Sequence, residues 1–431
     1  MPGFPARRAA LLALAAAAWT ANDGKLITVE QRDPLRSARA QRTADISGNG
    51  RYVAFASWAR LVAADVDDQP DIYVLDRDTL RVTLESDGLG DTENSHPRIS
   101  ADGRRLVFEV RATQPAYEPR VDVALRDRIA STVRLLTEKP GGTAFDWSRQ
   151  PDISEDGEVV VFSSASATLI PGTDANGARE DVYSLRLSTG AIERVSVTSA
   201  GVQLALGASS LPVVSGDGRY VAFNSTALLD GERPMTSGAD SPGSQVFLRD
   251  MITRTTARIS RSMRGTRPNG DSSAPSISAD GRYVTFSSDA SNIVGDDSNR
   301  GSDVFVVDRE TMTSTRVSRG EGGSTPSGVS FAAVISADGR FIVYQSDAGN
   351  LVCASRCTAA QRDINLLWDV FLFDRVSGKT TRVSEDELGG WMEWSAGPAI
   401  DGSGQVIAFS SRHPTDAQDL RHDLDLFIRR R

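Results

Sequence analysis

The sequence predicts an all-β fold, a single seven-bladed β-propeller of four-stranded blades whose ring is closed by an N-terminal strand. Three observations support this prediction. One sequence unit recurs seven times, each unit holds the strand and turn signals of one blade, and the strand that the last unit lacks stands before the first unit. We assign residues 25–431 to the propeller and residues 1–18 to a signal peptide.

A turn glycine marks the register of the repeat. It follows a short apolar piece and precedes a run of β-branched and aromatic residues, as in ISADGRYVTF. Glycine adopts positive φ without steric cost, so each unit should contain a tight hairpin at this point. The glycines in register are Gly50, Gly103, Gly157, Gly218, Gly281, Gly339 and Gly404.

A second run, DVFVVD at 303–308 in its clearest form, recurs in all seven units and predicts the third strand of each blade. A blade cannot cover its own two faces, so stacked blades must bury them against each other. We therefore expect apolar side chains such as Val284, Phe286, Val304 and Val306 to fill the layers between blades.

The two ends of the chain account for the last strand. Six units carry a short fourth run, but the seventh stops soon after its third. The segment KLITVE, Lys25 to Glu30, has the composition of a strand and precedes the first unit. We expect it to pair with Leu426 to Arg429 and close the ring. The last three arginines, Arg429 to Arg431, should form a solvated tail.

The first residues are typical of an export signal. Arg7 and Arg8 precede an apolar run from Ala9 to Ala18, which is too short to span a bilayer as a helix and ends in an A-x-A pattern. The alternative is a disordered alanine-rich tail or a misassigned start. Export predicts a periplasmic or secreted protein.

Composition limits the partners. The net charge of −9 argues against nucleic acid, and we find no basic stripe with interleaved aromatic residues. No later segment is long and apolar enough for a membrane span. We expect a monomer that binds a protein partner or a cell-surface polysaccharide.

Two cysteines, Cys353 and Cys357, stand in one loop of the sixth unit. In an exported protein this C-x-x-x-C pair favours a local disulfide that rigidifies the loop. Metal binding by two cysteines without a nearby histidine is less favoured.

The long segments are polar loops that should share one face of the ring. They span residues 57–70, 164–180, 224–244, 288–302 and 346–368. In a propeller the loops that join the second strand to the third lie on the same face as those that join one blade to the next. Functional residues concentrate on variable loops held by a rigid scaffold, so this face is the candidate binding face.

Four of these loops carry alternating acidic or amide residues before the third strand, in the pattern Asp-x-Asp/Asn. Such oxygen-rich loops suit calcium, although the flanking pattern is not that of an EF-hand. The alternative is Asx-turn chemistry, with the strand-initiating Asp paired to an arginine such as Arg316 or Arg382. The candidate metal ligands are Asp65, Asp67 and Asp71; Asp174, Asn176 and Asp181; Asp297, Asn299 and Asp303; and Asp363, Asn365 and Asp369.

The sequence offers few candidates for catalysis, and we assign no catalytic residue. It has three histidines and no recognisable hydrolase or metalloprotease motif. His96 should lie near the mouth of the central channel, where it is a base, a ligand or a hydrogen-bond partner of a neighbouring loop.

Two tryptophans are further candidates for a binding surface. Trp391 and Trp394 stand in WMEW, on the loop that enters the seventh unit. Exposed indole rings stack on sugars or anchor protein partners. The alternative is that they pack between blades or cover the channel.

The unit S-x-D-G-R-Y-V-x-F-x-S, followed by D-V-F-V-x-D and T-x-R-V-S, resembles the TolB-type, WD-repeat-like propeller repeat of bacterial exported proteins. The resemblance covers residues 45–431 and is strongest at 278–287 and 303–308. It implies a non-enzymatic module that binds proteins in the periplasm or outside the cell.

We therefore expect an exported, non-enzymatic propeller that acts as a protein-binding or scaffolding module through its long-loop face. One alternative is a calcium-stabilised module that binds polysaccharide. Another is a hydrolase or lyase with its site at the channel mouth.

Overall fold

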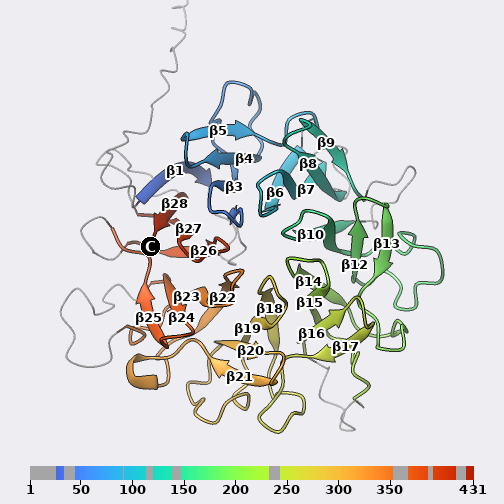
Figure 1. The fold of residues 1–431 in the computed structure, drawn as a ribbon, viewed down its shortest axis with the longest axis vertical. Helices are drawn as coiled ribbons and strands as arrows, with labels where there is room; N and C mark the ends of the chain where they lie inside the picture. The colour runs from blue at the N-terminus through green and yellow to red at the C-terminus, as the bar shows by residue number, and fades with distance from the viewer. Residues whose placement is uncertain are drawn as a thin grey trace, which may run out of the picture.

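The computed structural model describes residues 26–33, 44–90, 92–112, 120–137, 147–232, 243–352, 367–386, 392–413 and 424–431. They form seven four-stranded antiparallel sheets that surround a central axis (Figure 1). No helix in this part of the chain has the length and apolar character that crossing a membrane requires. The prediction of a seven-bladed propeller is confirmed.

The first four blades follow one another along the chain. Blade 1 consists of β2 (Ala44–Ile46), β3 (Tyr52–Ser57), β4 (Asp71–Asp76) and β5 (Arg81–Leu84). Blade 2 consists of β6 (Thr92–Ile99), β7 (Arg105–Ala112), β8 (Val121–Asp127) and β9 (Thr132–Leu135). Blade 3 consists of β10 (Ser148–Ile153), β11 (Val159–Ser164), β12 (Asp181–Arg186) and β13 (Ala191–Arg194). Blade 4 consists of β14 (Ser209–Val214), β15 (Tyr220–Ser225), β16 (Gln245–Asp250) and β17 (Thr255–Arg258).

The remaining blades complete the circle. Blade 5 consists of β18 (Ser272–Ile277), β19 (Tyr283–Ser288), β20 (Asp303–Asp308) and β21 (Thr313–Arg316). Blade 6 consists of β22 (Ser330–Ile335), β23 (Phe341–Ser346), β24 (Asp369–Asp374) and β25 (Lys379–Arg382), and the short 3-10 helix η1 (Glu321–Gly323) lies before it. Blade 7 consists of β26 (Ser395–Ile400), β27 (Val406–Ser411), β28 (Leu424–Arg430) and β1 (Leu26–Asp33).

The seventh blade closes the ring with the N-terminal strand, as predicted. Strand β1 pairs antiparallel with β28, with Ile27 opposite Ile428 and Val29 opposite Leu426. The first and last parts of the propeller thus share one sheet, which ties the ring shut without a covalent bond (Figure 1).

Apolar side chains fill the layers between blades, because successive residues of a strand point to opposite faces. In blade 5, Val284 and Phe286 are fully buried in the layer shared with blade 4. Val304 and Val306 are buried in the layer shared with blade 6. The predicted inter-blade positions are confirmed for all four residues.

The antiparallel strand order gives the ring two different faces. The hairpins that join strands one to two and three to four form one face, which we call the turn face. The loops that join strand two to strand three, and one blade to the next, form the opposite loop face. The sequence therefore places all the long loops on one side of a rigid ring.

Glycine is required on the turn face for two reasons. Gly281 has φ +69°, a conformation that side chains with a Cβ rarely adopt. A Cβ at this position would also lie 2.2 Å from Cδ2 of Tyr220 in the preceding blade. Arg309 covers the same ring, with its guanidinium carbon 4.3 Å from the centroid. The repeat glycine is thus a contact point between blades.

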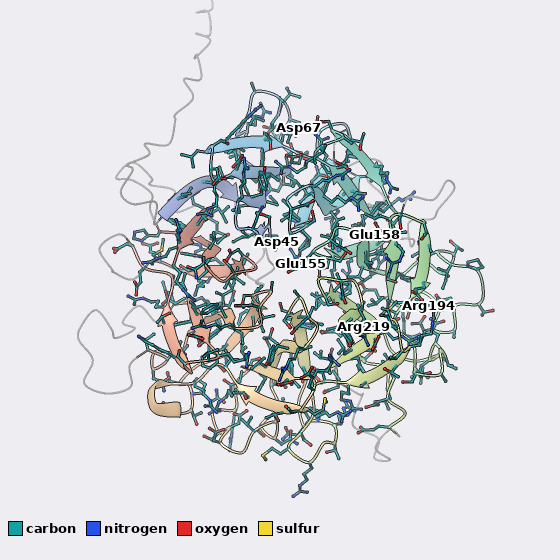
Figure 2. All side chains as sticks on the ribbon, in the orientation of Figure 1. Asp45, Asp67, Glu155, Glu158, Arg194 and Arg219 are labelled. Carbon is teal, nitrogen blue, oxygen red and sulfur yellow. The ribbon has the colours of Figure 1, made fainter. Side chains whose placement is uncertain are left out.

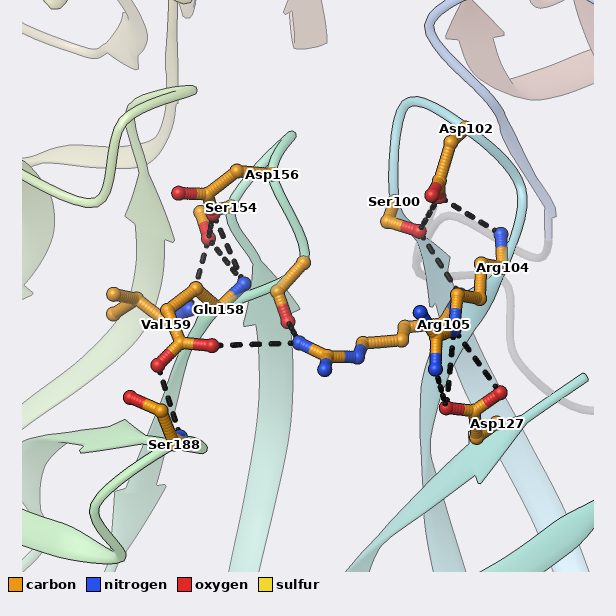
Figure 3. A network of polar contacts seen from close by, with 11 residues as sticks. Ser100, Asp102, Arg104, Arg105, Asp127, Ser154, Asp156, Glu158, Val159 and Ser188 are labelled. Carbon is orange, nitrogen blue, oxygen red and sulfur yellow. Dashed lines mark hydrogen bonds and ion pairs between the residues drawn. The ribbon is translucent and has the colours of Figure 1, made fainter. Parts of the chain in front are cut away.

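Arginines add polar bonds between neighbouring turns, as Figure 3 shows for blades 2 and 3. Arg105 Nη1 donates to the carbonyl of Gly157 at 2.6 Å and lies 3.5 Å from Glu158 Oε2. Arg104 pairs with Asp127 within its own blade at 2.8 Å. The turn face is therefore cross-linked from blade to blade.

The prediction of a solvated arginine tail is met only in part, because Arg430 and Arg431 are exposed but Arg429 and Arg431 contact the neighbouring blade. Arg429 Nη1 donates to the carbonyl of Val383 at 2.7 Å. The Arg431 guanidinium carbon lies 3.8 Å from the centroid of Phe341, in the position that Arg309 occupies over Tyr220. Arg429 and Arg431 bind the seventh blade to the sixth. Arg309, at the equivalent position after the third strand of blade 5, makes the same kind of contact with blade 4.

Candidate functional site

A side chain at the start of the third strand is anchored in the same way in the first six blades. Ser86 Oγ donates to Asp71 Oδ1 at 2.6 Å, and the hydroxyl also accepts from the backbone N–H of Ile72. This bond fixes one carboxylate oxygen and leaves the other for the loop that precedes the strand. The equivalent pairs are Thr137 with Asp122, Ser196 with Asp181, Ser260 with Gln245, Ser318 with Asp303 and Ser384 with Asp369.

In blade 3 the acidic loop closes around an amide from the same chain. Gln203 Nε2 lies 2.6 Å from Asp174 Oδ1, 2.7 Å from Asn176 Oδ1 and 2.7 Å from Asp181 Oδ2. The three predicted ligand residues do converge, because one nitrogen contacts an oxygen from each. That nitrogen occupies the point that a shared cation would need.

An arginine neutralises this loop of blade 3. Arg194 Nε lies 3.3 Å from Asp181 Oδ2, and its Nη2 lies 3.5 Å from Asp174 Oδ1. Burial raises the pKa of Asp181 to about 6, while the Ser196 hydroxyl and Arg194 oppose the shift. The site therefore holds two carboxylates, one guanidinium and two amides, Asn176 and Gln203, in contact with one another.

In blade 5 a fully buried arginine, Arg316, neutralises the charge of the acidic loop. Arg316 contacts Asp296 at 3.3 Å, Asp297 at 3.7 Å and Asp303 at 3.8 Å. Burial raises the pKa of Asp303 to about 6, and the charge of Asp297 adds to this effect. Asn299 turns its amide nitrogen to the carbonyl of Gly328 at 3.2 Å. The predicted pairing of the strand-initiating Asp with Arg316 is confirmed.

Blade 1 brings three carboxylates together. One oxygen from each of Asp65, Asp67 and Asp71 lies within 4.8 Å of the other two. Tyr73 donates its hydroxyl to Asp65 Oδ2, whereas Asp65 Oδ1 has no hydrogen-bond partner among the described residues. Burial raises the pKa of Asp71, and the charges of Asp65 and Asp67 raise it further.

Blade 1 differs from the other two at the position that carries the arginine. The strand ladder places Leu84 opposite Tyr73, as it places Arg194 opposite Tyr183 and Arg316 opposite Phe305. Leu84 packs its apolar side chain against the buried cluster between blades 7 and 1. Asp67 in blade 1 and Arg194 in blade 3 both lie toward the outside of their blades (Figure 2).

The other blades complete this series. In blade 2, Arg120 pairs with Asp122 at 2.7 Å, and in blade 4 Arg258 pairs with Asp230 at 2.7 Å. In blade 6 the strand-initiating Asp369 keeps its bond to Ser384 at 2.6 Å. The predicted ligands Asp363 and Asn365, the cysteines Cys353 and Cys357, and Trp391 lie outside the described residues.

His96 lies on the innermost strand of blade 2, as expected for a residue near the channel, and binds within its own blade. Its Nδ1 is 3.0 Å from Ser95 Oγ and 3.1 Å from Glu109 Oε2. Burial opposes ionisation of Glu109, but the neighbouring His96 and Arg149 hold its pKa below the usual value. This arrangement fits a hydrogen-bond partner that fixes the inner strand.

The central channel contains a small polar cavity toward the turn face. Its lining includes Asp45, Asp152 and Glu155, and its volume is about 110 Å³. Asp45 and Glu155 lie beside the central axis (Figure 2). Pockets for small molecules usually enclose roughly 300–1,000 Å³, so this cavity suits water or an ion better than an organic substrate.

The described tryptophans divide between packed and exposed rings. Trp394 is half-buried, with Arg412 5.4 Å from its centroid, and Trp368 packs edge-on against Phe331. Trp58 is 39 % exposed on the loop between β3 and β4. Trp58, rather than the predicted Trp394, is therefore the exposed indole ring on the loop face.

Two features of the acidic loops were not identified from the sequence. The alternation of arginine and leucine at the end of the fourth strand is visible in the printed units, as IERVSV against RVTLES, once their register is known. Gln203 comes from an inter-blade loop that has no repeat register, so no sequence signal points to it.

No protein-family model matches the chain, and no curated protein matches it. Solved structures do match over nearly the whole chain. An oligogalacturonate lyase from Vibrio parahaemolyticus is 12 % identical with a TM-score of 0.55, covering 94 % of this chain and 91 % of the lyase. The propeller domain of the Trilobed protease from Pyrococcus furiosus is 10 % identical with a TM-score of 0.54, covering 90 % and 94 %.

These likenesses show the fold and leave the activity open, because the identities are so low. TolB from Acinetobacter baumannii also matches, with 14 % identity and a TM-score of 0.42, over 88 % of this chain and 80 % of TolB. A TM-score this low supports no inference about the function of this chain. The comparisons therefore show a propeller fold, and the resemblance of the repeat to the TolB type stays a prediction from the sequence.

Proposed function

We propose that this protein is an exported binding propeller that recognises a protein partner through its loop face. The observation that supports this proposal is the difference between the two faces. The turn face consists of tight hairpins cross-linked by arginines, whereas the loop face carries the long loops on anchored strand starts. Rigid support with variable loops is the arrangement that binding surfaces use.

Exposed apolar side chains allow the two faces to be compared. Val66 is 80 % exposed and Leu206 is 75 % exposed, both on the loop face. Ile129 is 75 % exposed and Ile252 is 71 % exposed, both on the turn face. Because the two pairs match in exposure and character, substitutions in them separate binding by one face from a general loss of stability.

The test is capture of a partner from extracts of the source cells, with the purified chain immobilised. We expect V66E combined with L206E to lose a captured protein that the I129E and I252E combination retains. Glutamate in a buried contact leaves an unpaired charge, so a loss of at least tenfold is expected, or about 1.4 kcal/mol. Equal loss in both variants, or capture that neither variant changes, would contradict the proposal.

Polysaccharide recognition is the second candidate, and exposed Trp58 favours it. An indole ring on a loop supplies a flat apolar surface on which a sugar ring can stack. Affinity electrophoresis through gels that contain cell-surface polysaccharides tests this function directly. Retardation of the wild-type chain that W58A abolishes would support it. Equal mobility of the two chains in all gels would rule out Trp58 as the sugar contact.

A further inference from the structure

We propose that the loop between β3 and β4 binds one divalent cation of the calcium class through Asp65, Asp67 and Asp71. This site is a feature of blade 1 and does not depend on which partner the loop face recognises. Four observations support it: the geometry of the oxygens, an unpartnered buried oxygen, the missing arginine and the chemical nature of the donors.

The geometry fits a single ion. Calcium binds oxygen at about 2.3–2.6 Å, so two oxygens on one ion can lie at most about 5 Å apart. One carboxylate oxygen from each of the three aspartates lies within 4.8 Å of the others, which meets this limit. The alternating positions 65 and 67, with Asp71 at the start of β4, bring the side chains to one point.

An unpartnered oxygen points to a missing ligand. Asp65 is only 8 % exposed, and within the described part of the chain its Oδ1 has no hydrogen-bond partner. Its other oxygen accepts from Tyr73, so the side chain is held in place. A buried carboxylate oxygen without a partner is costly, and a coordinated cation removes that cost.

The charge balance of blade 1 also requires a cation. Blades 3 and 5 place Arg194 and Arg316 against their acidic loops, but blade 1 has Leu84 at this position. Arg60, on the same loop, directs its guanidinium to Asp68 at 2.8 Å and to the carbonyl of Asp67. Among the described residues, no guanidinium forms an ion pair with these three carboxylates, which share a partly buried space.

The donor set selects the class of metal. The cluster contains carboxylates only, with neither histidine nor cysteine, which excludes a typical zinc or copper site. Calcium accepts carboxylates in flexible geometry, whereas magnesium demands a near-ideal octahedron and keeps several waters. An irregular loop that supplies three carboxylates therefore favours calcium over magnesium.

The ion would fix the loop that carries two exposed apolar side chains of blade 1. Trp58 and Val66 stand on the same loop as the ligands, and Val66 lies between Asp65 and Asp67. Cross-linking positions 65 and 67 to the start of β4 would restrict the loop to one shape. The cation is thus a structural part of the loop face.

Terbium, which replaces calcium and is excited through nearby tyrosine, provides the probe. Tyr73 contacts Asp65 directly, so terbium bound to the intact chain should luminesce on tyrosine excitation, and calcium should displace it. D67N keeps the Oδ1 that accepts from Gln69 N and removes one charge. We expect it to weaken terbium and calcium affinity by about tenfold or more.

The matched control is D174N in blade 3, where the retained Oδ1 still contacts Gln203. D174N should leave the terbium signal and its calcium competition unchanged. Calcium should also raise the unfolding midpoint of the wild type and D174N by about 2–4 °C at saturation, and raise D67N by less. Absence of terbium luminescence and of a calcium shift in the wild type would overturn the proposal. Equal losses in D67N and D174N would overturn the assignment to blade 1.

Discussion

The acidic loops of blades 1 and 3 lie at the same place in the repeat and have similar patterns, with Asn176 in blade 3 where blade 1 has Asp67, but their environments differ. In blade 3 an amide nitrogen lies at the convergence point of three oxygens, and Arg194 balances the charge. In blade 1 three carboxylates converge, Leu84 replaces the arginine, and Asp65 Oδ1 lacks a hydrogen-bond partner within the described residues.

Under our proposal, only the first of two loops that carry similar oxygen ligands binds a cation. Acidic residues are present in both blades, but only in blade 3 does the fourth strand supply an arginine that balances their charge. Positions 84 and 194 are equivalent in the ladder, so this side chain is one difference between the loops. The others are Asn176 at the place of Asp67 and the amide of Gln203 at the convergence point. Substitutions at positions 84 and 194 should exchange the two behaviours.

The largest effect should follow from R194L, which gives blade 3 the leucine of blade 1. Arg194 is mostly buried and faces both Asp174 and Asp181, so its loss leaves two carboxylates unbalanced. Breaking a buried ion pair in this way typically costs about 3–5 kcal/mol of unfolding free energy. Denaturant unfolding in the presence of chelator measures the loss. R194L with wild-type stability would mean that the arginine does not balance the loop.

The reverse substitution, L84R, should abolish the cation requirement of blade 1. A guanidinium at this position would face Asp65 and Asp71 and compete with calcium, so the calcium affinity should fall about 100-fold or more, or about 2.7 kcal/mol. The calcium-free protein should melt at the same or a higher temperature. Calorimetric titration gives the affinity.

L135R in blade 2 is the control for L84R, because Leu135 occupies the same ladder position without an Asp-x-Asp loop beside it. It should leave calcium binding unchanged. If L84R bound calcium like the wild type, the missing arginine would not explain the site in blade 1.

A smaller effect should appear in the pH dependence of stability. Burial raises the pKa of Asp181 from 3.8 to about 6, so the folded state holds this proton more tightly than the unfolded chain. Its contribution to stability is therefore full below pH 3.8, is lost as pH rises to about 6, and is constant above. The positive charge of Arg194 lowers the raised pKa of Asp181, and R194L removes that charge. In R194L the fall in stability should therefore continue to higher pH.

Urea unfolding between pH 4 and pH 7, in chelator, compares the two chains. Asp303, whose pKa is also raised to about 6, contributes equally to both, so their difference reports Asp181. Parallel pH profiles in the wild type and R194L would contradict the coupling between Arg194 and Asp181.

The fold could be predicted from the sequence because its signals are local and repeated. The glycine of each turn, typified by Gly281, is required by positive φ and by the ring of the preceding blade, so it recurs in register. The closing strand was predictable because the seventh unit lacks one strand, which β1 (Leu26–Asp33) supplies. The role of Arg431 was missed, because its contact with Phe341 crosses between blades.

The site was predictable only in part. The pattern at Asp65, Asp67 and Asp71 identified the acidic loop, and the ladder partner Leu84 was readable in the aligned units. By contrast, Gln203 reaches the blade 3 site from a loop between blades, where neither length nor composition repeats. Contacts that cross between units need the three-dimensional arrangement, whereas contacts within a unit follow from its register.

A calorimetric calcium titration of the intact chain tests the central comparison most directly. Among the acidic loops that the structure describes, the blade 1 loop brings three carboxylates together without a facing arginine, so we predict that it binds one ion. That binding should be abolished or strongly weakened in D67N and unchanged in D174N. Absence of binding, or binding that D174N weakens and D67N does not, would contradict the assignment of the cation to blade 1.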